Sequence, residues 1–128
     1  MLAALVLALA AADASAETAR SDYYASLSGI EVDDRSARKG CRTVPLSARE
    51  VCLDNAATTR SASRARAGAQ LKSADAGRAS GREIMAAYQE SVADAQRTGH
   101  AAATHKCDAL SREGRVSCNA TTKALYRR

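Results

Sequence analysis

Apolar side chains recur at helical spacing along the first third of the chain. Steps of three, four or seven residues place them on one face of a helix, at Tyr23, Leu27, Ile30, Ala37 and Cys41. The charged Asp34 falls on the same face and interrupts it. The pattern predicts a helix over residues 17–42.

A second helix is predicted to begin soon after Pro45, because proline is excluded from helix interiors and turns the preceding residue toward extended geometry. Ser47 and Glu50 have the spacing of a capping box, in which each side chain bonds the backbone of the other. We therefore expect a helix over residues 47–72. Beyond Val51 its apolar face is mostly alanine, so we expect this arm to stand free of a core.

A stretch of small residues follows the second predicted helix. Residues 73–81 are mostly small and include two glycines, which predicts a hinge. A second capping-box spacing, from Ser80 to Glu83, predicts that a helix starts there. Apolar residues recur at helical steps beyond it, at Ile84, Tyr88 and Val92. A serine and a glycine between the last two cysteines predict a weaker reversal before a final arm over residues 115–126.

The four cysteines form two pairs with the same spacing. Ten residues separate Cys41 from Cys52, and ten separate Cys107 from Cys118. In one straight helix the members of such a pair would lie about 16 Å apart, whereas a disulfide requires Cα atoms roughly 4.4–6.8 Å apart. The chain must reverse between the two members for a disulfide to form, so we predict a disulfide-stapled helical hairpin in each unit.

Other arrangements of the cysteines stay open at this point. Four cysteines allow three connectivities, and cross-pairing between the units would fold the chain back on itself. A four-cysteine zinc site usually has ligand pairs two to four residues apart, so we predict no metal. His100 and His105 are five apart and lack the i, i+4 spacing of a helical metal pair, so we expect them at the surface.

Together these elements predict an all-α protein. Its two disulfide-stapled hairpins of long thin helices are joined by a glycine-containing hinge. We expect the first hairpin over residues 17–72, the linker over residues 73–81 and the second hairpin over residues 82–128.

Residues 1–16 have the features of a secretory signal peptide. The apolar run from Leu2 to Ala12 is shorter than the roughly 20 residues that span a bilayer. Ala14 and Ala16 flank a serine in the small-residue pattern of a cleavage site. No basic residue precedes the run, and the alternative is a short buried N-terminal helix. We predict a periplasmic or secreted protein with no transmembrane span after signal removal, a compartment in which disulfides persist.

Composition limits the core and leaves a positive charge. The 128 residues are 46% hydrophobic but include no Phe or Trp, and much of that fraction is alanine, a strong helix former that buries little surface. Small cores of this kind usually need covalent staples. The net charge of +5, from 19 basic and 14 acidic residues, fits solvated helix faces or contact with an anionic partner.

No arrangement of residues predicts catalysis. The sequence offers no assignable Ser-His-Asp or Cys-His set and no phosphate-binding glycine loop, so we expect no enzyme activity, cofactor or small-molecule substrate. We predict an exported structural or binding protein whose partner is an anionic envelope component or another protein. The alternatives are a small secreted inhibitor of an extracellular enzyme such as lysozyme, and a basic helical binder of anionic envelope surfaces.

The cysteine flanks resemble a known pattern. Residues 48–52, Ala-Arg-Glu-Val-Cys, and residues 107–111, Cys-Asp-Ala-Leu-Ser, are similar to the two halves of a motif found in small exported Ala/Lys-rich helical proteins of proteobacteria with paired C-x10-C motifs. The chain departs from that pattern at Pro45, at Gly114 and in its use of arginine where those proteins have lysine. The resemblance implies an exported helical protein, and it implies no particular activity.

Overall fold

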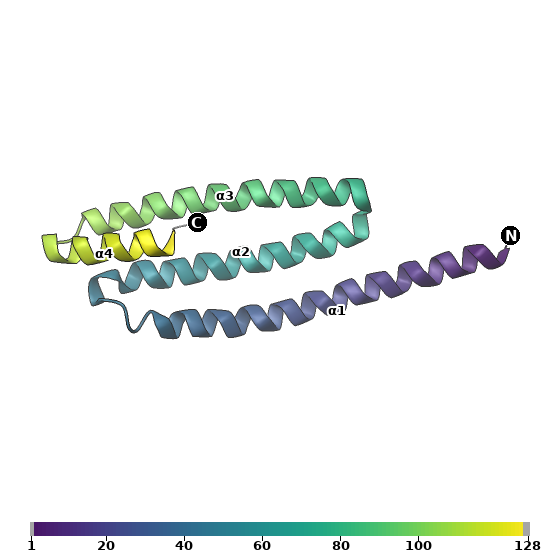
Figure 1. The fold of residues 1–128 in the computed structure, drawn as a ribbon, viewed down its shortest axis with the longest axis horizontal. Coiled ribbons are helices and arrows are strands. Elements are labelled where there is room, and N and C mark those ends of the chain that lie inside the picture. Colours follow the sequence, from purple (N-terminus) through teal and green to yellow (C-terminus); the bar gives the residue numbers. More distant parts are fainter. Residues whose placement is uncertain (1, 127–128) are drawn as a thin grey trace.

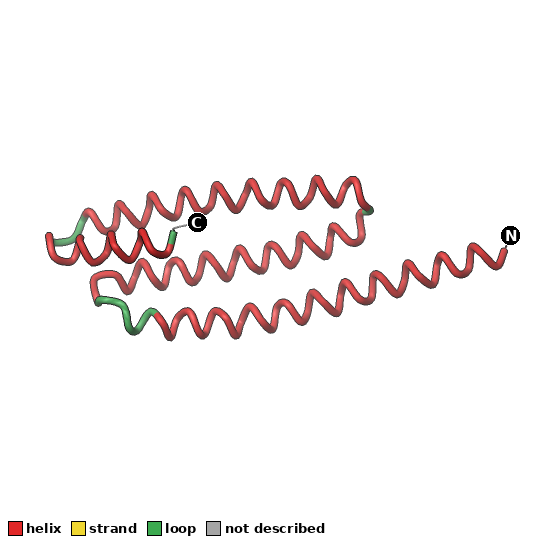
Figure 2. Tube along the Cα trace, in the orientation of Figure 1, coloured by secondary structure: helices red, strands yellow, loops and turns green. Residues whose placement is uncertain are grey.

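The computed structural model describes the backbone of residues 2–126 and the side chains of residues 16–77 and 79–126. The prediction of an all-α fold is confirmed, with no strand among the described residues (Figures 1 and 2). The elements in chain order are α1 (Leu2–Gly40), the short 3-10 helix η1 (Leu46–Ala48), α2 (Arg49–Ala76), α3 (Arg78–Asp108) and α4 (Arg112–Leu125).

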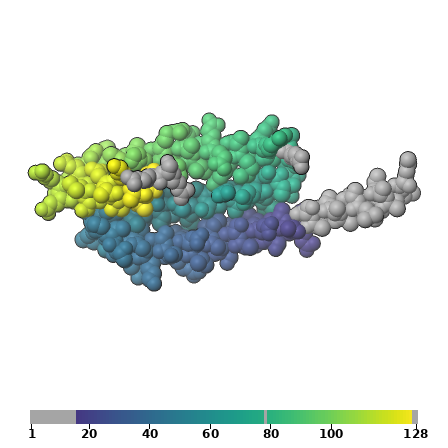
Figure 3. Space-filling model, in the orientation of Figure 1, coloured from purple at the N-terminus to yellow at the C-terminus, as the bar shows by residue number. Residues whose placement is uncertain are grey.

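The three long helices lie side by side with α2 in the middle (Figure 1). Helix α2 packs against both α1 and α3, and α4 packs against α3, α2 and η1 at one end of the molecule. Figure 3 shows the same order on the surface, with α1 along one edge. The prediction that the second arm stands free of a core is therefore wrong. Ala56 and Ala67 of α2 are buried, because small side chains let neighbouring helices approach closely.

Two disulfides close the turns as the cysteine spacing predicted. Cys41, just after α1, is bonded to Cys52 of α2 with Cα atoms 5.6 Å apart. Cys107 of α3 is bonded to Cys118 of α4 with Cα atoms 5.4 Å apart. All four cysteines are used, which excludes both cross-pairing and a zinc site that needs their thiolates. The two bonds indicate a non-reducing, extracytoplasmic environment.

Both disulfide-bonded turns lie at the same end of the molecule, because the helices run alternately up and down (Figure 1). Here η1 packs on α4, with Ala48 fully buried. A cluster of buried residues lies beside these turns and contains Val51, Ala103, Cys107 and Cys118, with Leu125 and Tyr126 packed against it. All four cysteines are among the buried residues of the described chain, so the disulfides also contribute to the buried surface.

The helix starts differ from the predicted capping boxes. The chain enters α2 through the 3-10 turn after Pro45, and neither this turn nor α2 has a side-chain capping bond, so the predicted Ser47 cap is wrong. Helix α3 begins at Arg78, before the predicted cap at Ser80. Ser111 does occupy the N-cap position of α4, again without a side-chain bond. No side-chain cap therefore fixes the reversals that precede α2 and α4, each of which is closed by a disulfide.

The turn between α2 and α3 takes a single residue. Gly77 has φ +84° and ψ 169°, a region that is essentially restricted to glycine. The rest of the expected linker, residues 73–81, is helical. A Cβ at Gly81 would lie 2.6 Å from the Ser73 side-chain oxygen and 3.0 Å from its backbone oxygen, so the missing side chain allows the two helices to pack tightly at the turn. Further along, the Tyr88 hydroxyl donates to the Ala62 carbonyl oxygen of α2 at 2.9 Å.

The predicted signal peptide falls mostly outside the described side chains. Its backbone from Leu2 onward belongs to α1, while Met1 and the side chain of Ala14 are not described. In the part of the chain that the structure describes, no helix combines the length and apolar character that a bilayer crossing requires.

Candidate functional site

Positive charge is concentrated at the first disulfide-bonded turn. Residues 35–49 contain five basic and no acidic residues, which matches the net charge of +5 for the whole chain. The five are Arg35, Arg38, Lys39, Arg42 and Arg49. They belong to the last turns of α1, the connecting loop and the start of α2. Because these five charges equal the net charge, basic and acidic residues are equal in number over the remainder of the chain. We call residues 35–49 together with 107–118 the stapled end.

Two of these five side chains are engaged within the protein. Arg38 bonds Asp34 through its Nε, 3.0 Å from Oδ2, and Arg49 donates from Nη2 to the Arg42 carbonyl oxygen at 3.2 Å, which holds the loop. Arg35, Lys39 and Arg42 are exposed and form no ion pair with a described residue. Their charges remain available to a partner in solution.

Exposed aliphatic side chains lie at the same end. Leu46 in η1 is 77% exposed and Val116 in α4 is 66% exposed, while Leu110 between α3 and α4 is 37% exposed. Each is within a few residues of a buried cysteine. An exposed aliphatic group gains free energy on leaving water, so this end combines basic side chains with apolar ones that lack cover.

An ion-pair cluster lies beside the stapled end. Lys106 of α3 donates to Glu50 Oε1 of α2 at 3.2 Å and to Asp54 Oδ2. These hydrogen bonds, first from Asp54 and then from Glu50, raise the pKa of Lys106 above its ordinary value. Lys106 balances one of the two negative charges, and the pairs tie α3 to α2 beside the disulfides.

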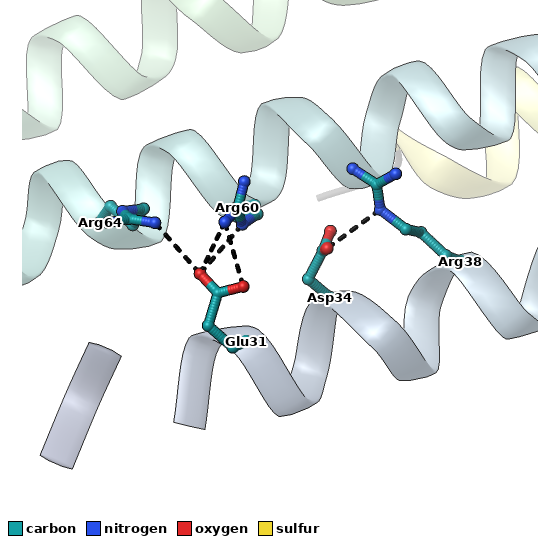
Figure 4. Close-up of polar contacts among 5 residues, drawn as sticks. All are labelled: Glu31, Asp34, Arg38, Arg60 and Arg64. Atoms are coloured by element: carbon teal, nitrogen blue, oxygen red, sulfur yellow. Dashed lines mark hydrogen bonds and ion pairs between the residues drawn. The ribbon is translucent and has the colours of Figure 1, made fainter. Parts of the chain in front are cut away.

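A groove runs between α1 and α2 and is bounded at one end by the last turn of α4. Its volume is about 640 Å³. Glu31 and Asp34 point from α1 toward α2, where Arg60 and Arg64 point back (Figure 4). Arg60 Nη2 lies 2.8 Å from Glu31 Oε1 and 3.0 Å from Oε2, and Arg64 Nη1 lies 3.1 Å from Oε1. These contacts join α1 to the middle helix.

The pKa of Glu31 is lowered from its ordinary value, first of all by the hydrogen bonds from Arg60. A carboxyl whose pKa is lower in the folded than in the unfolded protein adds stability above its unfolded pKa, and this is lost as the pH falls through the folded pKa. We expect Glu31→Gln to be less stable than the wild type near pH 7 and equally stable near pH 2, measured by urea unfolding. Glu90→Gln, which removes an exposed carboxyl without an ion pair to a described residue, should match the wild type. A Glu31→Gln deficit of the same size at both pH values would contradict the assignment.

The structure places the residues singled out in the sequence at different sites. The four cysteines meet at the stapled end. His100 and His105 are exposed, and the His100 ring lies beside Tyr126 with centroids 5.6 Å apart. Among the described residues, no group of three or more potential metal ligands comes together. Sequence reasoning missed the stapled end as a surface, although a local count of charge over residues 35–49 would have found its basic part.

Comparison of the chain with protein-family models, with curated proteins and with solved structures gives no match. Architecture and surface therefore define the class: an antiparallel helical protein with two disulfide-stapled turns and a basic end that carries exposed aliphatic side chains.

Proposed function

We propose that this chain is an exported helical binding protein that attaches through its stapled end to anionic lipid surfaces of the cell envelope. One observation carries the proposal: residues 35–49 account for the net charge of the chain and include Leu46, which is 77% exposed. The protein acts in this role by binding, without catalysis.

The chemistry of the surface suits a layer of anionic headgroups. A basic side chain near such a surface contributes about 1 kcal/mol of attraction. An aliphatic side chain that enters the boundary between headgroups and acyl chains adds roughly 0.8 kcal/mol per buried CH₂. Arg35, Lys39 and Arg42 supply the first contribution and Leu46 the second. The adjoining disulfide fixes these groups on one rigid turn, so little conformational entropy is lost on binding.

Several observations support a periplasmic or secreted location. The two disulfides favour an oxidising compartment. An apolar segment with a small-residue cleavage pattern at Ala14 and Ala16 begins the sequence. The resemblance to small exported proteobacterial helical proteins points to the same location. The alternative role as an inhibitor of an extracellular enzyme such as lysozyme stays a prediction, which a lysozyme assay with added protein tests.

Cosedimentation with vesicles tests the proposed function. We expect the protein to sediment with phosphatidylglycerol-containing vesicles and to remain in solution with vesicles of phosphatidylcholine alone. The bound fraction should fall as ionic strength rises from about 0.1 M to about 1 M, because the screening length shrinks from about 10 Å to about 3 Å. Binding to both vesicle types alike, or binding indifferent to salt, would contradict the proposal.

A further inference from the structure

A second groove lies between α2 and α3 at the point where α4 ends. Helix α4 has 14 residues and α3 has 31, so α4 lies along only part of its neighbour (Figure 1). The last residues of α4 bound the groove on one side, at Leu125 and Tyr126. Its volume of about 420 Å³ falls in the range of small-molecule sites. We call it the α2–α3 groove.

The lining of the α2–α3 groove is rich in uncharged hydrogen-bonding groups. It contains three of the five Asn and Gln residues of the chain and two of its four tyrosines, and none of the 14 acidic residues. The amides are Asn55, Gln89 and Gln96, and the tyrosines are Tyr88 and Tyr126. A side-chain amide both donates and accepts hydrogen bonds, and so does a sugar hydroxyl. The groove therefore presents groups that suit a ligand with several hydroxyls.

These amides are accessible and have no partner inside the protein. Gln89 and Gln96 are exposed and Asn55 is half-buried. None of the three side chains is hydrogen-bonded to a described residue, and the same holds for the hydroxyls of Thr59 and Ser63 in the lining. A molecule in the groove can reach these donors and acceptors without breaking a contact of the bundle.

The two tyrosine rings of the groove are held in place by contacts with the backbone. The Tyr88 hydroxyl donates to the Ala62 carbonyl oxygen at 2.9 Å. The Tyr126 ring lies against Gly99 of α3, where a Cβ would come 3.1 Å from its Cε1. An aromatic face is electron-rich and attracts the C–H groups on one face of a sugar ring. Since both rings are already fixed, little conformational entropy is lost when a ligand packs on them.

Arg66 gives the groove a positive charge that the bundle does not offset. It is the one charged residue in the described lining, it is exposed, and it forms no ion pair with a described residue. No residue three or four positions away from it is acidic, so α2 itself offers it no partner. Arg60 and Arg64 of the same helix, by contrast, are both paired with Glu31. A carboxylate is the partner that a free guanidinium binds best.

We propose that the α2–α3 groove binds a sugar ring that carries a carboxylate, such as a hexuronic acid. Arg66 pairs with the carboxylate, the amides exchange hydrogen bonds with the hydroxyls, and a tyrosine ring packs against the C–H face of the sugar. A neutral sugar lacks the ion pair, and a plain carboxylic acid lacks the hydroxyls. The site is separate from the proposed lipid-binding surface, since no residue of the stapled end lines it.

Three probes with one six-membered ring each test the chemistry on the unaltered protein. Isothermal titration should give saturable binding of one methyl glucuronide per chain. Methyl glucoside should bind about fivefold more weakly, as the loss of an exposed ion pair implies. Cyclohexanecarboxylate keeps the charge but loses every hydroxyl, so it should bind more weakly still. An affinity for either of these two probes equal to that for methyl glucuronide, or no binding of methyl glucuronide, would overturn the proposal.

The side-chain amide signals in nuclear magnetic resonance spectra locate the bound sugar. Methyl glucuronide should shift the signals of Asn55, Gln89 and Gln96. The other two amides of the chain, Gln70 and Asn119, do not line the groove, and their signals should stay in place as internal controls. Shifts of equal size in all five amides would contradict the assignment.

Variants test the two kinds of contact separately. Arg66→Gln should bind methyl glucuronide about fivefold more weakly and methyl glucoside as the wild type does. Arg112→Gln is the matched control, because it removes the same charge from an exposed position about 20 Å from Tyr126 along α4. Gln89→Leu combined with Gln96→Leu should weaken the binding of both sugars and leave that of cyclohexanecarboxylate unchanged.

Unchanged binding of methyl glucuronide by folded Arg66→Gln would overturn the role of the ion pair and with it the proposal. If Arg66→Gln does not fold, the glutamine double variant and the amide signals decide the matter. Both glutamines are exposed, so the double variant leaves the packing of the bundle intact. A double variant that binds methyl glucuronide as tightly as the wild type would equally overturn the site.

Discussion

Replacing Cys107 and Cys118 together by alanine should lower the free energy of unfolding by about 3–5 kcal/mol, a large part of the total for a domain of this size. About 3 kcal/mol is expected from the restored freedom of the unfolded chain, since the disulfide closes a loop of roughly ten residues. The rest comes from packing, because both cysteines are almost completely buried in the core with Val51 and Ala103.

The first disulfide provides a matched control for this result. Cys41–Cys52 has the same sequence separation of 11 as Cys107–Cys118, so the two bonds restrict the unfolded chain to the same extent. Cys41 and Cys52 are also buried, but they lie outside the cluster that Val51 and Ala103 form with Cys107 and Cys118, so we expect their replacement by alanine to cost about 1 kcal/mol less. Urea unfolding followed by circular dichroism measures both variants. Equal losses would show that packing within that cluster adds no more than packing around Cys41 and Cys52.

Replacing Lys39 and Arg42 by glutamine should weaken binding to anionic vesicles roughly 30-fold, because each basic side chain contributes about 1 kcal/mol and about 1.4 kcal/mol corresponds to tenfold in affinity. Both side chains are exposed on the stapled end and form no ion pair with a described residue, so their removal disturbs no contact in the bundle. Quantitative cosedimentation at low salt gives the affinity.

The control for that variant changes net charge equally at the opposite end of the molecule. Lys72 of α2 and Arg82 of α3 flank the Gly77 turn and are exposed. With both replaced by glutamine, the protein should bind within about threefold of the wild type, since charges farther from the surface than a Debye length of about 10 Å are largely screened. Equal loss in the two double variants would mean that the protein senses lipid only through its net charge, and the stapled end would then have no special role.

Helix α2 shows that an alanine-rich helix without large apolar side chains can lie at the centre of a bundle. Its sequence has a weak apolar face, which led to the expectation of an arm outside the core, yet Ala56 and Ala67 are buried between neighbouring helices. Small side chains contribute little surface each but allow close backbone approach. The bare Gly81 does the same beside Ser73. Hydrophobic periodicity measures burial of large side chains and therefore misses contacts of this kind.

Some features of the stapled end and the groove between α1 and α2 can be read from the sequence, and others depend on packing. The basic character of residues 35–49 is a property of the sequence. The exposure of Leu46 depends on how η1 packs against α4, two elements from different hairpins. Asp34 is visible in the sequence as a charge on an apolar stripe, but its burial depends on the packing of α2 against α1.

The sequence by itself determined the helical class and favoured a disulfide within each unit. Helix formation follows from local spacing and alanine content, and cysteines eleven residues apart can meet only where the chain turns back, but the structure was needed to exclude cross-pairing between the units. Only the tertiary structure decided that the two hairpins pack together with α2 between α1 and α3, and that both disulfide-bonded turns share one end. That arrangement depends on many weak contacts between small side chains distant in sequence, and such contacts leave no periodic pattern along the chain.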